Sequence, residues 1–270
     1  MYFQIERILG YILGFILFYS PTVLFTRLIY YLFNNKAEYI SIHSICFRIQ
    51  IEHLLDGKLY TMDIAFFSCI IILFIVTFFY GPIFCGWLCP TGAFTEYISK
   101  IIPERYQIDW SEYVDITSIR YGMLVGYLIL PFWGGLLACN YCNFYLFDLF
   151  INYFLFGYFI SLTASLLITV FLWIIILGMF TKGGRGYCNF LCPVGAIQNL
   201  IHFIGVNFNF VYRLKLDKKK CIGCQKCKNS CPMRSIKIQE HKAIYNRNNC
   251  IVCRVCIEKC PVKAISYNKG

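Results

Sequence analysis

Two similar cysteine runs lie near the end of the chain, and they constrain its fold more than any other feature. The runs are Cys221-x2-Cys224-x2-Cys227-x3-Cys231-Pro232 and Cys250-x2-Cys253-x2-Cys256-x3-Cys260-Pro261. This spacing is typical of bacterial chains that carry two [4Fe-4S] clusters. Structural zinc sites also use paired Cys-x2-Cys units. Structural zinc sites do not require, however, four cysteines in each of two runs that both end in Cys-Pro.

The fourth cysteine of each run is expected to serve the other cluster. Three thiolates on a tight loop cap three irons, and the fourth, after the proline turn, points to the neighbouring cluster. We assign one [4Fe-4S] cluster to Cys221, Cys224, Cys227 and Cys260, and the other to Cys250, Cys253, Cys256 and Cys231. Such clusters exchange single electrons. Residues 207–270 are therefore predicted to form a small α+β two-[4Fe-4S] ferredoxin domain of the bacterial type.

The remainder of the chain is strongly apolar. Hydrophobic residues make up 59% of the 270 residues and charged residues 14%, against about 25% charged in an ordinary soluble domain. Four apolar stretches have the length of about 20 residues that a membrane-crossing helix needs. They cover approximately residues 8–33, 62–82, 120–138 and 154–180. Residues 1–206 are therefore predicted to form an all-α membrane domain of four transmembrane helices.

Positive charge is concentrated towards the C-terminus. Residues 181–270 hold 17 of the 25 Lys and Arg but three of the 14 acidic residues. Four crossings place both termini on one side. The basic residues near the predicted helix ends favour the cytoplasm for that side only weakly; they are Arg7, Lys100, Arg105, Arg120, Lys182 and Arg185, against Arg27, Lys36, Arg48 and Lys58 on the other side. Cytosolic thiols also stay reduced and available for clusters. We expect both termini and the ferredoxin domain in the cytoplasm. A nucleic-acid partner is not expected, because the regular spacing in the basic region is that of its cysteines and not of its basic residues.

A second cysteine pattern occurs twice in the apolar part. The fourteen residues from Cys85 and from Cys188 match at seven positions, including Cys-x3-Cys-Pro in both. Both halves start on the same side, so the predicted repeat is parallel and brings its cysteines together at one end. We hypothesise a third metal centre, iron–sulfur or another metal, held by Cys85, Cys89, Cys188 and Cys192. The alternative is two redox-active or structural thiol pairs whose proline only starts a helix.

These features together resemble the NapH-type membrane ferredoxins. The resemblance rests on Phe84-Cys-Gly-Trp-Leu-Cys-Pro-Thr-Gly-Ala93, on Tyr187-Cys-Asn-Phe-Leu-Cys-Pro-Val-Gly-Ala196 and on the two cysteine runs. That family provides quinol-dehydrogenase membrane components of periplasmic nitrate reduction. Its wider relatives include a nitrous-oxide reductase activator and a cytochrome-oxidase accessory protein.

The resemblance implies a multi-pass protein of the prokaryotic inner (cytoplasmic) membrane. It would move electrons between the quinone pool and a partner redox protein in anaerobic respiration. The partner implied is a periplasmic ferredoxin-type subunit or a reductase, with quinol as the substrate. The alternative is an electron-donating maturation or assembly factor for a metalloenzyme.

Two groups of residues remain open. Quinol oxidation needs groups that accept protons, and the candidates in the predicted outer loops are His43, Glu52, His53 and Asp148. The simpler interpretation of each is a solvated loop residue. Cys46, Cys69, Cys139 and Cys142 also lie outside the patterns above. Cys69 is expected to be a small buried hydrophobe. For the other three we consider a Cys139–Cys142 disulfide, metal binding or an electron relay.

Overall fold

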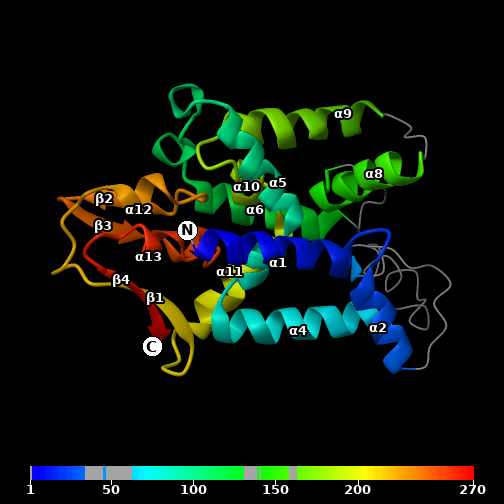
Figure 1. The fold of residues 1–270 in the computed structure, drawn as a ribbon, viewed down its shortest axis with the longest axis horizontal. Helices are drawn as coiled ribbons and strands as arrows, with labels where there is room; N and C mark the ends of the chain where they lie inside the picture. The colour runs from blue at the N-terminus through cyan, green and yellow to red at the C-terminus, as the bar shows by residue number, and fades with distance from the viewer. Residues whose placement is uncertain (1, 34–44, 47–62, 131–138, 140, 158–162) are drawn as a thin grey trace.

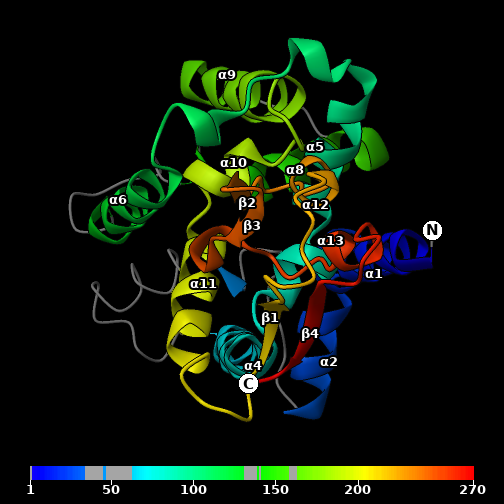
Figure 2. The same cartoon turned by 90° about the vertical axis from the view of Figure 1, so that its left-hand side faces the viewer.

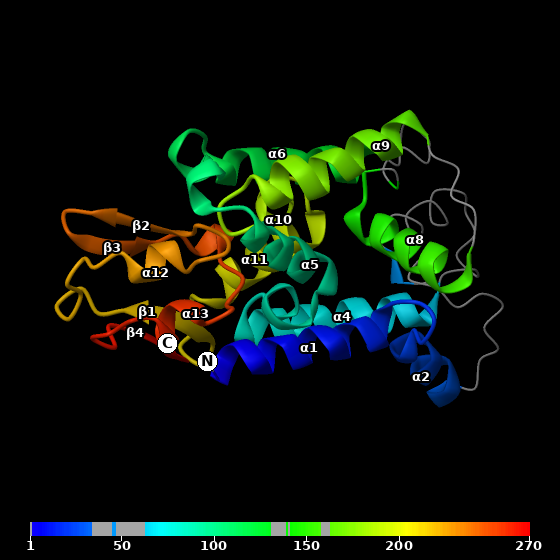
Figure 3. The same cartoon turned by 45° about the horizontal axis from the view of Figure 1, so that its top comes forward.

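The computed structural model describes residues 2–33, 45–46, 63–130, 139, 141–157 and 163–270. Helices make up most of the described chain, and the strands gather near the C-terminus (Figure 1). Both termini lie at the end of the long axis that also holds the strands (Figures 1 and 3).

Most of the helices precede the first strand in the chain. In order they are α1 (Tyr2–Phe18), α2 (Leu24–Leu32), α4 (Ile64–Tyr80), η3 (Phe84–Leu88), α5 (Pro90–Ile98), η4 (Ser99–Ile101), η5 (Glu104–Tyr106), η6 (Trp110–Glu112), α6 (Ile116–Ile129), α8 (Asn143–Phe156), α9 (Ala164–Val170), η8 (Phe171–Met179), α10 (Gly186–Phe190) and α11 (Pro193–Gly205). α1 packs against η3 and α5, and α11 packs against α4 and α6. η3 and η8 are π-helical, a form that is frequent at functional sites.

The prediction of an all-α membrane domain with four transmembrane helices in two parallel repeats is wrong. None of the helices in the described ranges combines the length and the hydropathy that crossing a bilayer requires. Local stop signals shorten them: α1 ends at Phe18, before Pro21, and α4 has 17 residues between its caps, Asp63 and Gly81. Parts of the apolar stretches 120–138 and 154–180 lie outside the described residues. The cytoplasmic placement of both termini depends on the crossings, so it does not follow from this structure.

The outer faces of two long helices carry exposed apolar side chains. On α1 these are Ile5, Leu9, Ile12, Leu13 and Ile16, and on α4 they are Phe67, Ile71, Ile72, Ile75 and Phe79. Extended apolar surfaces are uncommon on a protein that works alone. These faces are therefore candidate surfaces for contact with other molecules.

The cysteine-rich region forms two small antiparallel sheets and two one-turn helices. β1 (Tyr212–Leu216) pairs with β4 (Ile265–Lys269), and β2 (Ile236–Gln239) pairs with β3 (Lys242–Tyr245). The helices are α12 (Lys226–Asn229) and α13 (Val255–Glu258), and η9 (Arg247–Asn249) precedes the second cysteine run. In Figure 2 this region faces the viewer, in front of α4, which is seen end on.

The cysteine-rich region packs directly on the helical part. Trp87 Nε1 donates a hydrogen bond to the carbonyl of Val252 (3.0 Å), and Asn189 Nδ2 donates to the carbonyl of Met233 (3.0 Å). The division into domains at residues 1–206 and 207–270 stays a prediction. What the structure adds is a buried interface between the two segments.

Candidate iron–sulfur sites

The eight cysteines of the two runs line two small apolar cavities. Cys221, Cys224, Cys227 and Cys260 line the first cavity. Cys231, Cys250, Cys253 and Cys256 line the second cavity. Each cavity therefore has three cysteines from one run and the fourth from the other run. These are the same two sets that the spacing assigns.

The loops of the two runs make the same backbone turns. Gly223 and Val252, each two residues after the first cysteine, have φ angles of 70° and 49°. Gln225 and Arg254, each directly after the second cysteine, have φ angles of 63° and 62°. A β-branched residue at positive φ is unusual and persists only where its surroundings hold it. The two runs are therefore structural repeats that curl around their cavities in the same way.

Backbone N–H groups reach the sulfur atoms in both cavities. Ala243 N donates to Cys221 Sγ (3.4 Å), and Val252 N donates to Cys250 Sγ (3.3 Å). The N–H groups of Ala243 and Gly223 lower the pKa of Cys221 below its ordinary value. The thiolate is the form of cysteine that ligates metal, and hydrogen bonds to sulfur tune cluster potentials. The loops therefore suit anionic sulfur ligands.

The structure also brings together the cysteines of the two Cys-x3-Cys-Pro motifs. Cys85, Cys89, Cys188 and Cys192 are all buried, with at most 9% exposed. Burial, Cys89 and Cys188 raise the pKa of Cys85, so these thiols lie within electrostatic reach of one another. Cys89 and Cys192 are the N-caps of α5 and α11, which both begin with proline. This follows the preference of proline for the first helical position.

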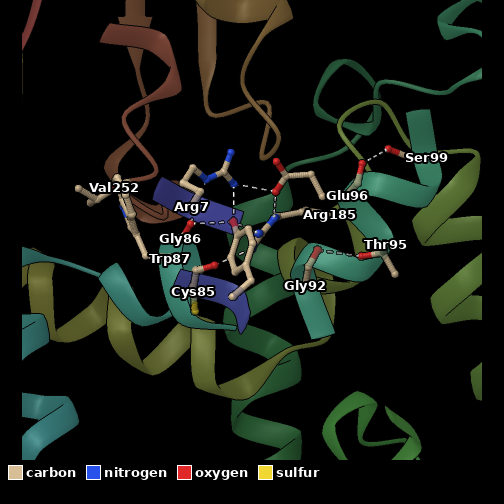
Figure 4. A network of polar contacts seen from close by, with 11 residues as sticks. Arg7, Cys85, Gly86, Trp87, Gly92, Thr95, Glu96, Ser99, Arg185 and Val252 are labelled. Carbon is tan, nitrogen blue, oxygen red and sulfur yellow. Dashed lines mark hydrogen bonds and ion pairs between the residues drawn. The ribbon is translucent and has the colours of Figure 1, made fainter. Parts of the chain in front are cut away.

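A buried charge network lies beside these cysteines (Figure 4). Glu96 accepts hydrogen bonds from Arg7 Nη2 (2.9 Å) and Arg185 Nε (2.6 Å). Arg185 Nη1 also donates to the carbonyl of Cys85 (2.7 Å), and Arg7 Nε donates to the carbonyl of Gly86 (3.2 Å). Burial opposes ionisation of Glu96, but Arg185 and Arg7 outweigh it, and the pKa of Glu96 lies below its ordinary value. The network therefore ties the first motif to the start of α10.

A further buried arginine, Arg120 of α6, approaches the same cysteines. It is 1% exposed, and its Nη1 donates to the carbonyl of Asn248 (3.0 Å). Its Nε and Nη2 have no hydrogen-bond partner among the described residues. Cys85, Cys192 and Cys188 are among its electrostatic neighbours. Because arginine keeps its proton in proteins, Arg120 is an incompletely paired buried charge.

These arginines differ from what the sequence predicts. Arg7, Arg120 and Arg185 are predicted as flanking charges at helix ends, whereas the structure buries all three. Glu96 has no predicted role. The signal that could have found this network is a charged residue close to each motif. Glu96 stands seven residues after Cys89, and Arg185 stands three residues before Cys188.

The proposed quinone residues are placed only in part. His43, Glu52 and His53 lie outside the described residues. Asp148 lies in α8, is 6% exposed and accepts a hydrogen bond from Asn152 Nδ2 (3.0 Å). Asp148 is therefore buried and not a solvated loop residue. The quinone site stays a prediction.

Three of the remaining cysteines lie near one another. Burial, Cys46 and Cys139 contribute to raising the pKa of Cys142 to about 12. Cys69 lies within α4 and is partly exposed. The roles considered for Cys46, Cys139 and Cys142 stay predictions.

Two protein families match the chain. The family described as a 4Fe-4S binding domain matches residues 62–108 and 165–210, and the family described as a 4Fe-4S dicluster domain matches residues 213–261. The first family therefore matches both copies of the Cys-x3-Cys-Pro motif. The second covers both four-cysteine runs.

Proteins of related sequence include a ferredoxin-type protein and a candidate electron transport protein. The ferredoxin-type protein NapH of Haemophilus influenzae is 28% identical over 168 residues, which cover 60% of this chain and 53% of that protein. YccM of Escherichia coli, named as a candidate electron transport protein, is 24% identical over 185 residues (67% of this chain, 50% of that protein). An uncharacterised protein of Methanocaldococcus jannaschii is 27% identical over 176 residues (63% of this chain, 58% of that protein).

The matched region spans about half to three fifths of the length of these three relatives. No solved structure matches the chain. The family matches and the relatives support iron–sulfur clusters and a role in electron transfer. The chain is therefore similar to NapH-type ferredoxin proteins and contains matches to two 4Fe-4S families.

Proposed function

We propose that this chain is an iron–sulfur subunit that passes single electrons between the quinone pool and a partner redox protein. The observation that carries the proposal is the pair of cavities, each lined by four cysteines and each completed by a cysteine of the other run. [4Fe-4S] clusters supply one-electron oxidation and reduction. The two cysteine sets of the runs are proposed as their ligands. The chain holds the clusters in apolar surroundings and directs N–H groups at their sulfur ligands.

The position of the two cavities supports a path between the interior and the surface. Cys231 and Cys253 of the second cavity pack against Cys85 and Cys188 in the interior. Cys224 of the first cavity is exposed, and its neighbour Ile222 is 62% exposed. A partner redox protein is therefore proposed to exchange electrons at the first cavity.

The proposed partners follow from the resemblance and from the surface. The NapH-type family implies a quinol as electron donor and a periplasmic ferredoxin-type subunit or reductase as partner. The exposed apolar faces of α1 and α4 support work within a complex. No site of terminal catalysis is proposed in this chain.

The test is anaerobic purification of the full chain, followed by counting of iron and acid-labile sulfide and by EPR during titration with a reduced quinol analogue. We expect at least about eight irons and eight sulfides per chain, since each cluster holds about four of each. We also expect EPR signals that change as the quinol analogue reduces the clusters. Cys227→Ser and Cys253→Ser should each perturb one EPR signal, whereas Cys69→Ser should perturb neither.

Zinc without iron or sulfide in the purified protein would contradict the proposal. Clusters that quinol does not reduce would contradict the quinone part of it. A deletion strain that makes a metalloenzyme lacking only its metal would instead support the maturation factor.

A further inference from the structure

The helical part of the chain holds four cysteines that the electron path proposed above does not use. We propose that Cys85, Cys89, Cys188 and Cys192 hold a third [4Fe-4S] cluster, with Arg120 as the buried cation that balances its charge. All four thiols are buried, and Cys192 lies within electrostatic reach of Cys188, Cys85 and Cys89. The proposal goes beyond the proposed function, which needs the eight cysteines of the two runs.

Both motifs surround their sulfur atoms with hydrogen-bond donors. The backbone N–H groups of Gly92 and Gly195, in the first turns of α5 and α11, hydrogen-bond to Cys89 and Cys192. The side chain of Gln198 donates through Nε2 to Cys85 Sγ (3.3 Å). N–H groups directed at sulfur orient and stabilise cluster thiolates. The two halves therefore provide equivalent donors for an anionic sulfur cluster.

Arg120 indicates that a negative group belongs in this part of the interior. Its side chain is buried, and in the part of the chain that the structure describes its Nε and Nη2 have no hydrogen-bond partner. Within the described ranges, no carboxylate lies at ion-pair distance from it. A buried charge without a counter-charge is strongly unfavourable. The thiol groups of Cys85, Cys188 and Cys192 lie in its electrostatic surroundings, and as cluster ligands they would provide that counter-charge.

Equivalent glycines in the two motifs allow the guanidinium groups of two arginines to lie close to the motif backbone. A Cβ added at Gly195 would lie 2.6 Å from Arg120 Nη2. A Cβ added at Gly92 would lie 2.9 Å from Arg185 Nη1 and 3.3 Å from Cys188 Sγ. Both copies of Cys-Pro-x-Gly-Ala therefore admit an arginine beside the cysteines at the same position of the repeat.

The buried charges match the charge of a thiolate-bound cluster. Arg7 and Arg185 share the single carboxylate of Glu96, which leaves one net positive charge, and Arg120 adds a second. A [4Fe-4S] cluster with four thiolates carries about two negative charges when oxidised. Neutral thiols and disulfides carry none. Arg7 pairs with Glu96 and also lies in the electrostatic surroundings of Cys253 of the second cavity, so Arg120 is the cation that neutral thiols would leave without an anion.

The four cysteines also lie close to the second cavity. Cys85 and Cys188 pack against Cys231 and Cys253. The third cluster would therefore lie directly next to the second cavity.

Iron and sulfide counting on the anaerobically purified full chain tests the ligand set. We expect about twelve irons and twelve sulfides per chain for three clusters, against about eight for two. The double variant Cys85→Ser, Cys188→Ser should lose about four irons and four sulfides. It should keep the EPR signals of the two clusters proposed for the cysteine runs. The matched control Cys69→Ser should lose none. A wild-type count of about eight, or an unchanged count in the double variant, would overturn the proposal.

A redox titration followed by EPR tests the role of Arg120. Removal of its charge in Arg120→Gln should shift the midpoint potential of the third signal to a more negative value, because a nearby cation favours the reduced, more negative cluster. Arg120→Lys should restore the potential towards the wild-type value, and the exposed control Arg105→Gln should leave it unchanged. An unchanged potential in Arg120→Gln would refute this role.

A second variant covers the case in which Arg120→Gln does not fold. Gly195→Ala keeps the charge but pushes the guanidinium away, so it should shift the same potential or release only the third cluster. An unchanged third signal in Gly195→Ala would count against the role of Arg120. A wild-type count of about eight with clusters that quinol reduces would refute the third cluster while leaving the proposed function intact.

Discussion

At the scale of single residues, one carboxylate controls the charge balance of the interior. Glu96 pairs with Arg7 at 2.9 Å and with Arg185 at 2.6 Å, and its side chain is 7% exposed. Two guanidinium groups in such surroundings repel each other once the carboxylate charge is removed. Glu96 therefore both joins α5 to two distant segments and prevents a buried repulsion.

Replacement of this carboxylate should destabilise the protein strongly. We expect Glu96→Gln to lower the free energy of unfolding by about 3–5 kcal/mol, the usual effect of breaking a buried ion pair from one side. Glu112→Gln is the matched control, because Glu112 pairs with Lys228 but is 56% exposed, and its effect should stay below about 1 kcal/mol. Denaturant unfolding at pH 7 measures both. Equal effects would show that the buried network is not a source of stability.

The contribution of Glu96 should depend on pH in a definite direction. Its pKa is lower in the folded protein than its ordinary value. The stabilisation is therefore fully present above the unfolded pKa of about 4.3 and is lost as the pH falls through the lower, folded pKa. In denaturant titrations, the difference between wild type and Glu96→Gln should shrink at the acidic end of this range. A difference that does not change with pH would contradict the lowered pKa.

His202 should make a separate contribution to the pH dependence of the free energy of unfolding. This side chain of α11 is 4% exposed, and burial lowers its pKa to about 4. The unfolded chain, with a pKa of about 6.5, takes up the proton first as the pH falls. The free energy of unfolding should therefore decrease between about pH 6.5 and pH 4, by up to about 3 kcal/mol.

Unfolding of His202→Gln across the same range measures this contribution. The variant should lack this part of the pH dependence, whereas the exposed control His241→Gln should keep it. The same pH slope in His202→Gln and in wild type would exclude His202 as its source.

At the scale of elements, helix α1 positions the first Cys-x3-Cys-Pro motif. A Cβ added at Gly14 would collide with the carbonyl oxygen of Leu88, and one at Gly10 would collide with the carbonyl oxygen of Trp87. The helix therefore rests directly on the backbone of η3, which contains Cys85. Side chains larger than hydrogen at these two positions would separate the elements.

Gly14→Ala should accordingly loosen this contact. Overpacking of this kind costs about 1–3 kcal/mol, and we expect a corresponding loss in thermal or denaturant unfolding. Gly122→Ala in α6 is the matched control, because a Cβ there meets no atom of the described residues within 4 Å. The control should leave stability unchanged or raise it by up to about 1 kcal/mol through helix propensity. If Gly14→Ala were as stable as the control, α1 would not rest closely on η3.

The elements also show what sequence patterns can predict. Pro90 and Pro193 start α5 and α11, as proline directly after the second cysteine suggests. Helix lengths are harder to predict, because hydropathy does not show where Asp63 and Gly81 cap α4. The Arg7–Glu96 pair joins residues 89 positions apart. No local periodicity reports a contact of that range.

At the scale of the whole molecule, charge should influence which electron donors react fastest. The formal net charge is +11. Exposed Lys218, Lys219, Lys220 and Lys226 surround the start of the first cysteine run in sequence, close to exposed Cys224. Long-range attraction accelerates encounters between opposite charges and weakens with salt.

Stopped-flow reduction with two viologens tests this expectation. Reduction by the anionic radical of a sulfonated viologen should slow as salt is added, whereas reduction by the cationic methyl viologen radical should accelerate. The variant Lys218→Glu, Lys219→Glu, Lys220→Glu should reduce or reverse both trends. Lys100→Glu, in η4 outside the cysteine-rich region, should change them little. Equal salt effects in the two lysine variants would argue against electron entry near the first run.

Sequence patterns are most informative where the residues of a site lie close together in the chain. The spacing assigns two four-cysteine sets, and each set lines one cavity, while the role of these cysteines as cluster ligands stays a prediction. The prediction of a membrane-spanning architecture is wrong, because it assumes that each apolar stretch forms one uninterrupted helix. The burial of Arg120 also depends on how α6, α11 and η9 pack together.

The exchange of the fourth cysteines has a consequence for the order of synthesis. The first cavity takes three cysteines from residues 221–227, but its fourth, Cys260, comes from the end of the second run. The second cavity is completed earlier, at Cys256, and already contains Cys231. The ligand set begun first on the ribosome is therefore finished last. A nascent chain released before Cys250 therefore leaves both sets incomplete, and one released between Cys256 and Cys260 completes only the second set.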